Sequence, residues 1–401
     1  MNQLPGQCEG IVSANPFLLP LKKFPASFSA EEKQRLTAAM TKAAKEEVLP
    51  AYKKLAVFLR AEYVPKGRTA ISVESLPDGK RRYAEAVKVM TTVDIAPEAV
   101  HQLGLKEVAR ITAEMTKLAQ AQGYKDLAAF RAAINSDPKW QPKSEDQIVA
   151  DFKKHIDEMQ PRLPELFGLL PKSPVTVEAI PDFDKAAATH YVRGTPDGKR
   201  AGRVVVAVSD PTHRTLVLDE AVAYHEGVPG HHLQVGRAVV SSSRLNRWRR
   251  MGCWVSGHGE GWALYAERLM ADLGWLDDAG NRMGMLDAQR FRAARVVIDI
   301  GVHCGLTAPD GGVWDAERAW VFLQSHSAMA EENLRFELDR YLGWPGQAPS
   351  YAIGQRIWQQ LRDEMLGRGL SLKEFHSRAL DLGGLPLDAL RSALLTDVAA
   401  S

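Results

Sequence analysis

The sequence predicts a mainly α-helical protein with one small β-sheet, and three observations support this fold class. Capping motifs open several long segments whose apolar residues recur at helical spacing. One stretch, about residues 174–210, is instead made of short runs rich in β-branched residues. The 401 residues are 45% hydrophobic and 25% charged, values typical of a globular protein that can bury a full core.

Helical segments form the predicted scaffold on both sides of the β-rich stretch. Three patterns have a residue suited to the N-cap position before a helix: Ser29-Ala30-Glu31-Glu32, Ser144-Glu145-Asp146-Gln147 and Ser371-Leu372-Lys373-Glu374. The first opens a segment that runs, with Pro50 inside it, to about Tyr63. Residues 97–122 carry apolar positions at helical spacing and end at Gly123, a typical helix terminator.

The short runs VTVEAI, THYVR and GRVVVAVSD are separated by Pro, Gly and Asp, which predicts two to four strands. The last strand, near Arg203–Val208, leads through a loop into the helix that carries the histidines discussed below. Without a clear linker, we expect one unit over residues 1–401. Its expected parts are a helical part (1–170), a small β insert (171–218) and a second helical part (219–401).

Composition also excludes several classes of function. The net charge of +2, without a clustered basic face, argues against nucleic acid as a partner. The three cysteines form no CxxC pair, so neither a disulfide framework nor a cysteine zinc site is expected.

No apolar stretch approaches the roughly 18 residues that span a bilayer, and the first residues show no signal peptide. We expect a cytoplasmic protein as the chain is written, or a periplasmic or secreted one if the natural N-terminus is longer. Its oligomeric state is left open.

The segment 224-YHEGVPGHHLQ-234 combines metal-ligand residues with a helix breaker. A zinc peptidase helix usually carries H-E-x-x-H, with two histidines one turn apart. His225 and His231 are six residues apart, about 240° and 9 Å on a straight helix, whereas nitrogens on one zinc ion lie about 3–3.5 Å apart. Pro229 would clash with the carbonyl of His225, so we expect a kink that brings His231 or His232 back toward His225.

A metal site needs a further ligand, and the best candidate is Glu260 in 257-GHGEGWALYAERL-269. This stretch is expected to be a helix with Glu260 at its start. Glu267, seven residues on, would lie on the same face, unless it is a solvated residue or a partner of Arg268. His258 is a weaker alternative ligand. Three histidines that only cap and line a helix end remain the alternative to a metal site.

Five motifs together resemble those of the bacterial family known as domain of unknown function 885. These motifs, which cover essentially the whole chain, are TTVDIAPEAVHQLGLKEVARI (91–111), HEGVPGHHLQ, EGWALYAERL, RVVIDIGVH (295–303) and RYLGWPGQAPSYAIGQ (340–355). That family looks like a branch of the gluzincin metallopeptidases, helical proteins similar in plan to angiotensin-converting enzyme. Its pattern H-E-x-x-P-G-H implies His225 and His231 as metal ligands, Glu226 as general base and Glu260 as third ligand.

The resemblance implies a zinc-dependent peptidase that cleaves oligopeptides and holds one Zn²⁺ per chain, although other divalent transition metals suit the same ligands. Further roles are expected for five residues: Tyr351 and His303 as oxyanion donors, His232 and Gln347 in contact with substrate or the ligands, and Asp299 orienting a histidine ligand or capping a helix. The strand near 203–208 is expected to be an edge strand that pairs with substrate.

Two differences from the family accompany the resemblance. Relatives are usually longer, with an additional N-terminal helical region and often an export signal. They also commonly carry apolar residues where this chain has Gly257, His258 and Gly259, which is expected to alter the pocket. Two alternative functions are a zinc amidohydrolase acting on a non-peptide amide and a non-catalytic helical binding protein with a decayed site.

Overall fold

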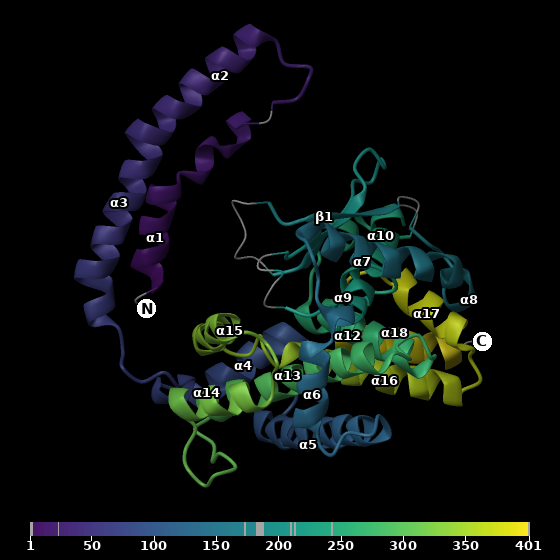
Figure 1. Cartoon of the computed structure of the whole chain (residues 1–401). Helices are drawn as coiled ribbons and strands as arrows, with labels where there is room; N and C mark the ends of the chain where they lie inside the picture. The colour runs from purple at the N-terminus through teal and green to yellow at the C-terminus, as the bar shows by residue number, and fades with distance from the viewer. Residues whose placement is uncertain are drawn as a thin grey trace. The chain divides into compact units, whose positions relative to one another are not determined.

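The computed structural model describes residues 3–22, 24–171, 174–181, 188–208, 211, 214–241 and 244–399. These residues form a mainly helical fold with one three-stranded sheet, which confirms the predicted fold class (Figure 1). Contacts divide the chain into two compact units. The first comprises the residues up to Ala70 together with Pro181, and the second comprises the other described residues from Ile71 onward. The sequence shows no clear linker at this boundary, and the predicted single unit over residues 1–401 stays a prediction.

The first unit consists of helical elements only. They are α1 (Gln3–Ala14), η1 (Pro16–Lys22), α2 (Ala30–Ala43), η2 (Ala44–Val48), α3 (Leu49–Phe58), η3 (Leu59–Tyr63) and η4 (Val64–Lys66). The predicted capping box is present, because Ser29 Oγ accepts from the backbone of Glu32 and Glu32 Oε2 accepts from the backbone of Ser29. Pro50 lies in the first turn of α3, where its missing N–H costs little, so the predicted long helical segment is confirmed.

The second unit contains the sheet and the remaining helices. The helices are η5 (Val73–Ser75), α4 (Gly79–Thr91), α5 (Pro97–Ala121), α6 (Leu127–Ser136), η6 (Pro138–Trp140), α7 (Glu145–Met159), η7 (Gln160–Arg162), α8 (Leu163–Leu166), α9 (Asp219–Glu226), α10 (His231–Val240), α11 (Arg247–Met251), α12 (Ser256–Asp272), α13 (Ala279–His303), α14 (Ala316–Ser325), α15 (Glu331–Gly343), α16 (Ser350–Gly367), α17 (Leu372–Asp381) and α18 (Leu387–Ala399). No helix among the described residues is both long and apolar enough to cross a membrane.

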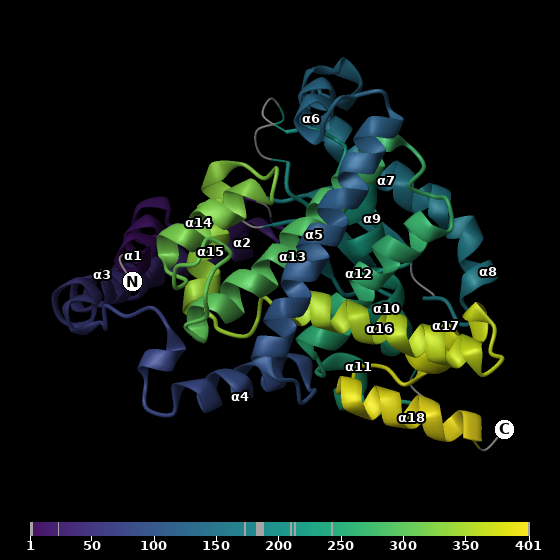
Figure 2. The same cartoon turned by 90° about the horizontal axis from the view of Figure 1, so that it is seen from below.

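Helix α13 forms the centre of the second unit. Nearly all of its residues are buried, and it packs along α5, while α12 packs along α16 (Figure 2). The predicted helix over 97–122 is confirmed as α5, followed by Gly123 in the left-handed region. Ser144 and Ser371 cap α7 and α17 as expected. The buried side chains of these helices form one continuous core around α9 and α12, which carry the candidate site.

The sheet has the order β1-β3-β2 and confirms the prediction of two to four strands. Its strands are β1 (Val175–Ala179), β2 (His190–Val192) and β3 (Gly202–Val206). Strand β3 pairs in parallel with β1 and antiparallel with β2, with Val204 opposite both Val177 and Tyr191. The expectation that the strand near 203–208 is an edge strand is therefore wrong, because β3 already has a neighbour on each side. Among the described strands, β1 and β2 form the edges.

Candidate metal centre

The segment with the histidines folds as two helices joined by a tight turn. Helix α9 ends at Glu226 and α10 begins at His231, so the expected kink is a complete break. The Val228–Pro229 peptide bond is cis, and the carbonyl of Pro229 accepts a hydrogen bond from Trp262 Nε1 of α12 at 2.9 Å. At Gly230 a Cβ atom would lie 1.9 Å from the carbonyl oxygen of His225. Only glycine therefore fits this close approach.

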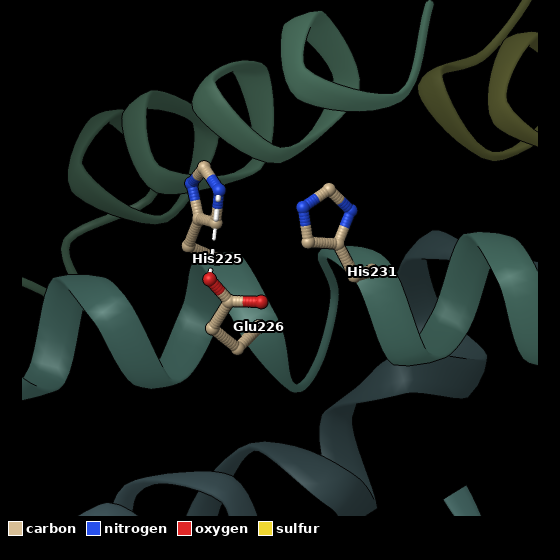
Figure 3. Close-up of side chains that lie close together, drawn as sticks. All are labelled: His225, Glu226 and His231. Atoms are coloured by element: carbon tan, nitrogen blue, oxygen red, sulfur yellow. Dashed lines mark ion pairs between the residues drawn. The ribbon is translucent and has the colours of Figure 1, made fainter. Parts of the chain in front are cut away.

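The break brings His225 and His231 together. Figure 3 shows both rings on the same side of the chain, with Glu226 beside His225. The two ring centroids are 4.9 Å apart and nearly perpendicular. The donor atoms of His225, Glu226 and His231 lie within 4.8 Å of one another, and all three residues are buried.

Glu260 completes this cluster from the first turns of α12. Its Oε2 lies 3.5 Å from His225 Nε2 and 3.5 Å from His231 Nε2. Ligands on a tetrahedral zinc ion with bonds of 2.0–2.1 Å are separated by roughly 3.3 Å. Glu226 Oε1 is farther away, 3.9 Å from His225 Nε2. The geometry therefore favours Glu260 over Glu226 as the third ligand and leaves Glu226 beside the ligand set.

The pKa shifts of His225 and Glu260 indicate that the cluster favours a positive charge. Burial lowers the pKa of His225, but its hydrogen bonds with Glu260 and Glu267 outweigh this and raise the pKa to about 9. Burial raises the pKa of Glu260, but His225 and His231 outweigh it, so the carboxyl is held well below its usual range. These buried carboxylates favour positive charge between the imidazoles, either as a proton or as a metal ion.

Glu267 contacts the second ring nitrogen of His225, Nδ1, whereas Nε2 faces Glu260. It is 0% exposed, lies two turns along α12 from Glu260, and its Oε1 is 2.7 Å from His225 Nδ1. A hydrogen bond to a carboxylate places the proton on Nδ1 and leaves Nε2 as the ligand atom. Arg292 of α13 pairs with the same carboxylate at 3.4 Å, whereas Arg268, the partner considered from sequence, pairs with Glu114 instead.

Glu226 is buried next to the histidines. Burial raises the pKa of its carboxyl, and Glu260 adds to this effect, while His225 and His231 act against it. A carboxylate whose pKa is shifted toward neutrality is suited to taking and returning a proton.

His232 and His258, which were considered from the sequence as alternative ligands, lie away from the cluster. His232 turns toward the sheet, where its Nδ1 is 3.2 Å from the hydroxyl of Tyr191 on β2. His258 lies in the core, with Nδ1 3.3 Å from Gln234 Nε2 and its ring against Trp358. Burial lowers the pKa of His258 to about 4. The structure therefore brings neither ring to the two Nε2 atoms that face Glu260.

Tyr351 stands near the ligands in the first turn of α16. Helices α12 and α16 cross closely at Gly261 and Gly354, where a Cβ on Gly261 would lie 2.5 Å from the Gly354 Cα. This crossing sets the start of α16 beside Glu260. Burial raises the pKa of Tyr351, and the nearby Glu260 carboxylate raises it further. The hydroxyl thus stays protonated at neutral pH and can donate a hydrogen bond.

Arg295 is a site residue that the sequence reasoning missed. It is 3% exposed on α13, and its guanidinium lies 4.3 Å from the ring centroid of Tyr351. Gln347 accepts from Arg295 Nη2 at 3.4 Å and from Arg340 Nη1 at 3.0 Å, and its side chain also hydrogen-bonds Tyr351. The available signal was an arginine within the apolar run of RVVIDIGVH, where a charge is retained only if it has partners.

His303 is not brought to the cluster. It is fully buried at the end of α13, where its Nδ1 accepts from the backbone N–H of Val73 at 3.3 Å and its Nε2 lies 3.0 Å from the carbonyl of Tyr341. Both ring nitrogens are therefore engaged by backbone groups in the core. The expected role of His303 as an oxyanion donor finds no support in this placement.

Asp299 serves neither of its expected roles. It contacts neither candidate histidine ligand and lies inside α13 (Ala279–His303), whose caps are Asp278 and Cys304. Its Oδ1 instead accepts from the hydroxyl of Tyr83 and from the backbone N–H of Gly346 at 3.0 Å. Asp299 thereby fixes the turn that precedes the first residues of α16.

One comparison with known proteins identifies the family, and two solved structures are similar to this chain. A family model described as "Bacterial protein of unknown function (DUF885)" matches residues 1–394. The crystal structure of a protein named a "putative lipoprotein" from Colwellia psychrerythraea is 27% identical, with a TM-score of 0.88, over 99% of this chain and 69% of that chain. A second, from Shewanella oneidensis, named a "putative lipoprotein of unknown function", is 18% identical, with a TM-score of 0.72, over 98% of this chain and 72% of that chain, and shows the fold alone. No curated protein matches. The chain therefore belongs to the bacterial DUF885 family.

Proposed function

We propose that this protein is a zinc-dependent metallopeptidase that hydrolyses peptide bonds of oligopeptides. One observation carries the proposal. Glu260 Oε2 lies 3.5 Å from the Nε2 atoms of both His225 and His231, with the carboxylate of Glu226 next to them. This arrangement provides three ligand atoms and an adjacent base, which is the composition of catalytic zinc sites that hydrolyse amides.

The residues fit one zinc ion. His225, His231 and Glu260 would hold it, and Glu267 would keep His225 in the tautomer that binds metal. Two imidazoles and one carboxylate are a common zinc set, and a fourth position is left for substrate or water. When bound, zinc supplies Lewis acidity, which polarises a carbonyl oxygen and lowers the pKa of water to about 7.

The protein's own residues then manage the protons and the developing charge. Glu226 accepts a proton as the water oxygen attacks the peptide carbonyl carbon, and it returns that proton to the leaving amine nitrogen as the C–N bond breaks. The Tyr351 hydroxyl donates a hydrogen bond to the carbonyl oxygen as that oxygen becomes negative. Arg295 holds the Tyr351 ring in place from the buried side.

The proposal is tested by metal analysis of the native protein together with the Glu226→Gln variant on a pool of oligopeptides. We expect one equivalent of zinc in both proteins, cleavage by the native protein, and a loss of at least about a hundredfold in rate for the variant. A metal-free native protein, or a fully active variant, would overturn the mechanism. Stoichiometric zinc with cleavage of non-peptide amides alone would instead identify an amidohydrolase.

We also infer that the protein works outside the cytoplasm. The Colwellia relative, matched over 99% of this chain, carries the word lipoprotein in its name, and lipoproteins are anchored outside the cytoplasm. The cytoplasmic location expected from the first residues has no such support. Fractionation of the producing bacterium tests this inference, which fails if the protein is found only with the cytoplasmic fraction.

A further inference from the structure

Trp254 is a large apolar side chain that remains exposed beside the candidate metal centre. It lies in the short loop between α11 and α12, and 49% of its surface is exposed. Its ring centroid is 5.6 Å from that of His231, with the two planes inclined at 58°. This indole therefore combines an exposed apolar surface with a direct ring contact to a candidate metal ligand.

A gap in the first turn of α12 receives the Trp254 ring. At Gly259, the neighbour of Glu260, a Cβ atom would lie 2.4 Å from the indole. Any other residue at this position would displace the ring. The absent side chain at Gly259 thus leaves space for the indole beside His231.

The backbone on both sides of Trp254 is tied down. The N–H of Cys253 donates to the carbonyl of Trp248 at 2.8 Å, and the carbonyl of Val255 accepts from the N–H groups of His258 and Gly259 at 3.0 and 2.9 Å. The loop backbone is therefore fixed on both sides of the ring, which itself packs on Gly259 and His231, so less ordering cost is added when a side chain packs against it.

The exposed indole offers an apolar surface to a substrate side chain. A large aliphatic or aromatic side chain that packs on it gains contact area, and an aromatic pair adds a further attraction. The ammonium group of a lysine, by contrast, is strongly hydrated and gains less from an exposed indole.

We propose that Trp254, seated on Gly259, forms an apolar subsite for an aromatic or large aliphatic side chain of the peptide residue next to the cleaved bond. This assignment rests on the proposed peptidase function, since it places the substrate at His231 and Glu260. It adds a substrate class: oligopeptides with a bulky apolar residue at that position.

Calorimetry with the zinc-loaded Glu226→Gln protein tests the subsite without turnover. The probes are Ala-Ala-Phe-Ala-Ala, the same peptide with Leu or Lys in place of Phe, and penta-alanine. We expect the Phe and Leu peptides to bind about tenfold or more tightly than penta-alanine, and the Lys peptide to show a clearly smaller gain. Adding Trp254→Ala should abolish this preference, Gly259→Ala should reduce it by displacing the ring, and Trp254→Phe should retain part of it.

Trp248→Ala is the matched control. Trp248 is 67% exposed on α11 and lies over Gly252 as Trp254 lies over Gly259, but among the described residues its ring stacks on no candidate ligand. Its loss should leave the ratio of affinities unchanged. Equal affinity for all four peptides, or a Phe preference that survives Trp254→Ala, would overturn the subsite. Failure of the peptidase proposal is recognised separately, by native protein that holds zinc and cleaves none of these peptides.

Discussion

At the scale of single residues, adjacent histidines acquire different environments. His231 faces His225 and Glu260, whereas His232 faces Tyr191 on the sheet. Successive residues of a helix point about 100° apart, so one residue of sequence decides which ring reaches the candidate metal. The contact of Glu267 with His225 is a second feature of single residues. Its carboxylate reaches His225 only because α12 packs against α9.

Replacing each adjacent histidine tests this division. His231→Ala is expected to lose stoichiometric zinc, because it removes one of three ligand atoms. His232→Ala should keep about one equivalent. Elemental analysis of both purified variants provides the measurement, and zinc retained in the first but lost in the second would contradict the assignment.

Replacing the carboxylate behind His225 tests the role of Glu267. Glu267→Gln keeps the size of the side chain but weakens the bond to Nδ1, so we expect zinc affinity to fall about 10- to 100-fold. Competition with a chromophoric chelator measures this change. The matched control is Asp272→Asn, near the end of the same helix but far more exposed, which should leave zinc affinity unchanged.

At the scale of elements, the site depends on the turn between α9 and α10 and on the packing of α12, α13 and α16. Trp262 of α12 bonds to the carbonyl of Pro229 in that turn, which connects the helix of Glu260 to the segment of the two histidines. Asp299 of α13 connects α4 to the turn before α16 through Tyr83 and Gly346. The position of Tyr351 thus depends on residues far from the ligands.

Gly230→Ala tests the turn. The added Cβ would lie 1.9 Å from the carbonyl oxygen of His225, so the two helices must move apart. We expect a destabilisation of about 1–3 kcal/mol together with weakened zinc binding. Thermal unfolding and zinc titration check both effects. Gly367→Ala is the control, since a Cβ there meets nothing within 4 Å, and it should change neither.

Asp299→Asn tests the connection through α13 by its pH dependence. Burial raises the pKa of Asp299 to about 7, even though Tyr83, Gly346 and Arg295 act against it. Between its ordinary pKa near 4 and pH 7 the folded state holds a proton that the unfolded state has released, so this group makes the protein less stable as pH rises through that range.

The amide cannot ionise, so Asp299→Asn should remove this loss of stability. The Tm of the variant minus that of the native protein is therefore expected to increase from pH 4 to pH 7 and then level off. Thermal unfolding across this range gives the difference, in which the contributions of all other groups cancel. A difference that stays constant with pH would show that Asp299 is charged throughout.

At the scale of the whole molecule, all the candidate site residues lie in the second unit. The buried clusters of hydrophobic residues also lie there, from Val73 onward. The first unit, in contrast, leaves Leu55, Val57, Phe58 and Tyr63 largely exposed on its helices. Core and site therefore belong together in one part of the chain.

A chain of residues 71–401 is expected to bind one equivalent of zinc, as proposed for the full chain, because it keeps every proposed ligand and the core that positions them. Elemental analysis and circular dichroism of the shortened protein provide the measurement. A folded but metal-free product would show that the first unit contributes to the site.

The sequence by itself determined the local structure and the residue types of the site. Capping at Ser29, Ser144 and Ser371, the helix over 97–122 and the small sheet follow from hydrogen bonds and side-chain patterns within a few residues. The helix break at Pro229 also follows from local sterics. Such features depend on neighbours along the chain, so a single sequence contains the needed information.

Only the tertiary structure decided which side chains meet. It placed β3 in the middle of the sheet, separated His231 from His232, moved His303 into the core and brought Arg295 to Tyr351. It also divided the chain near residue 70. These outcomes depend on how α9, α10, α12, α13 and α16 pack against one another. That packing is set by the shapes of side chains distant in sequence, which no local pattern records.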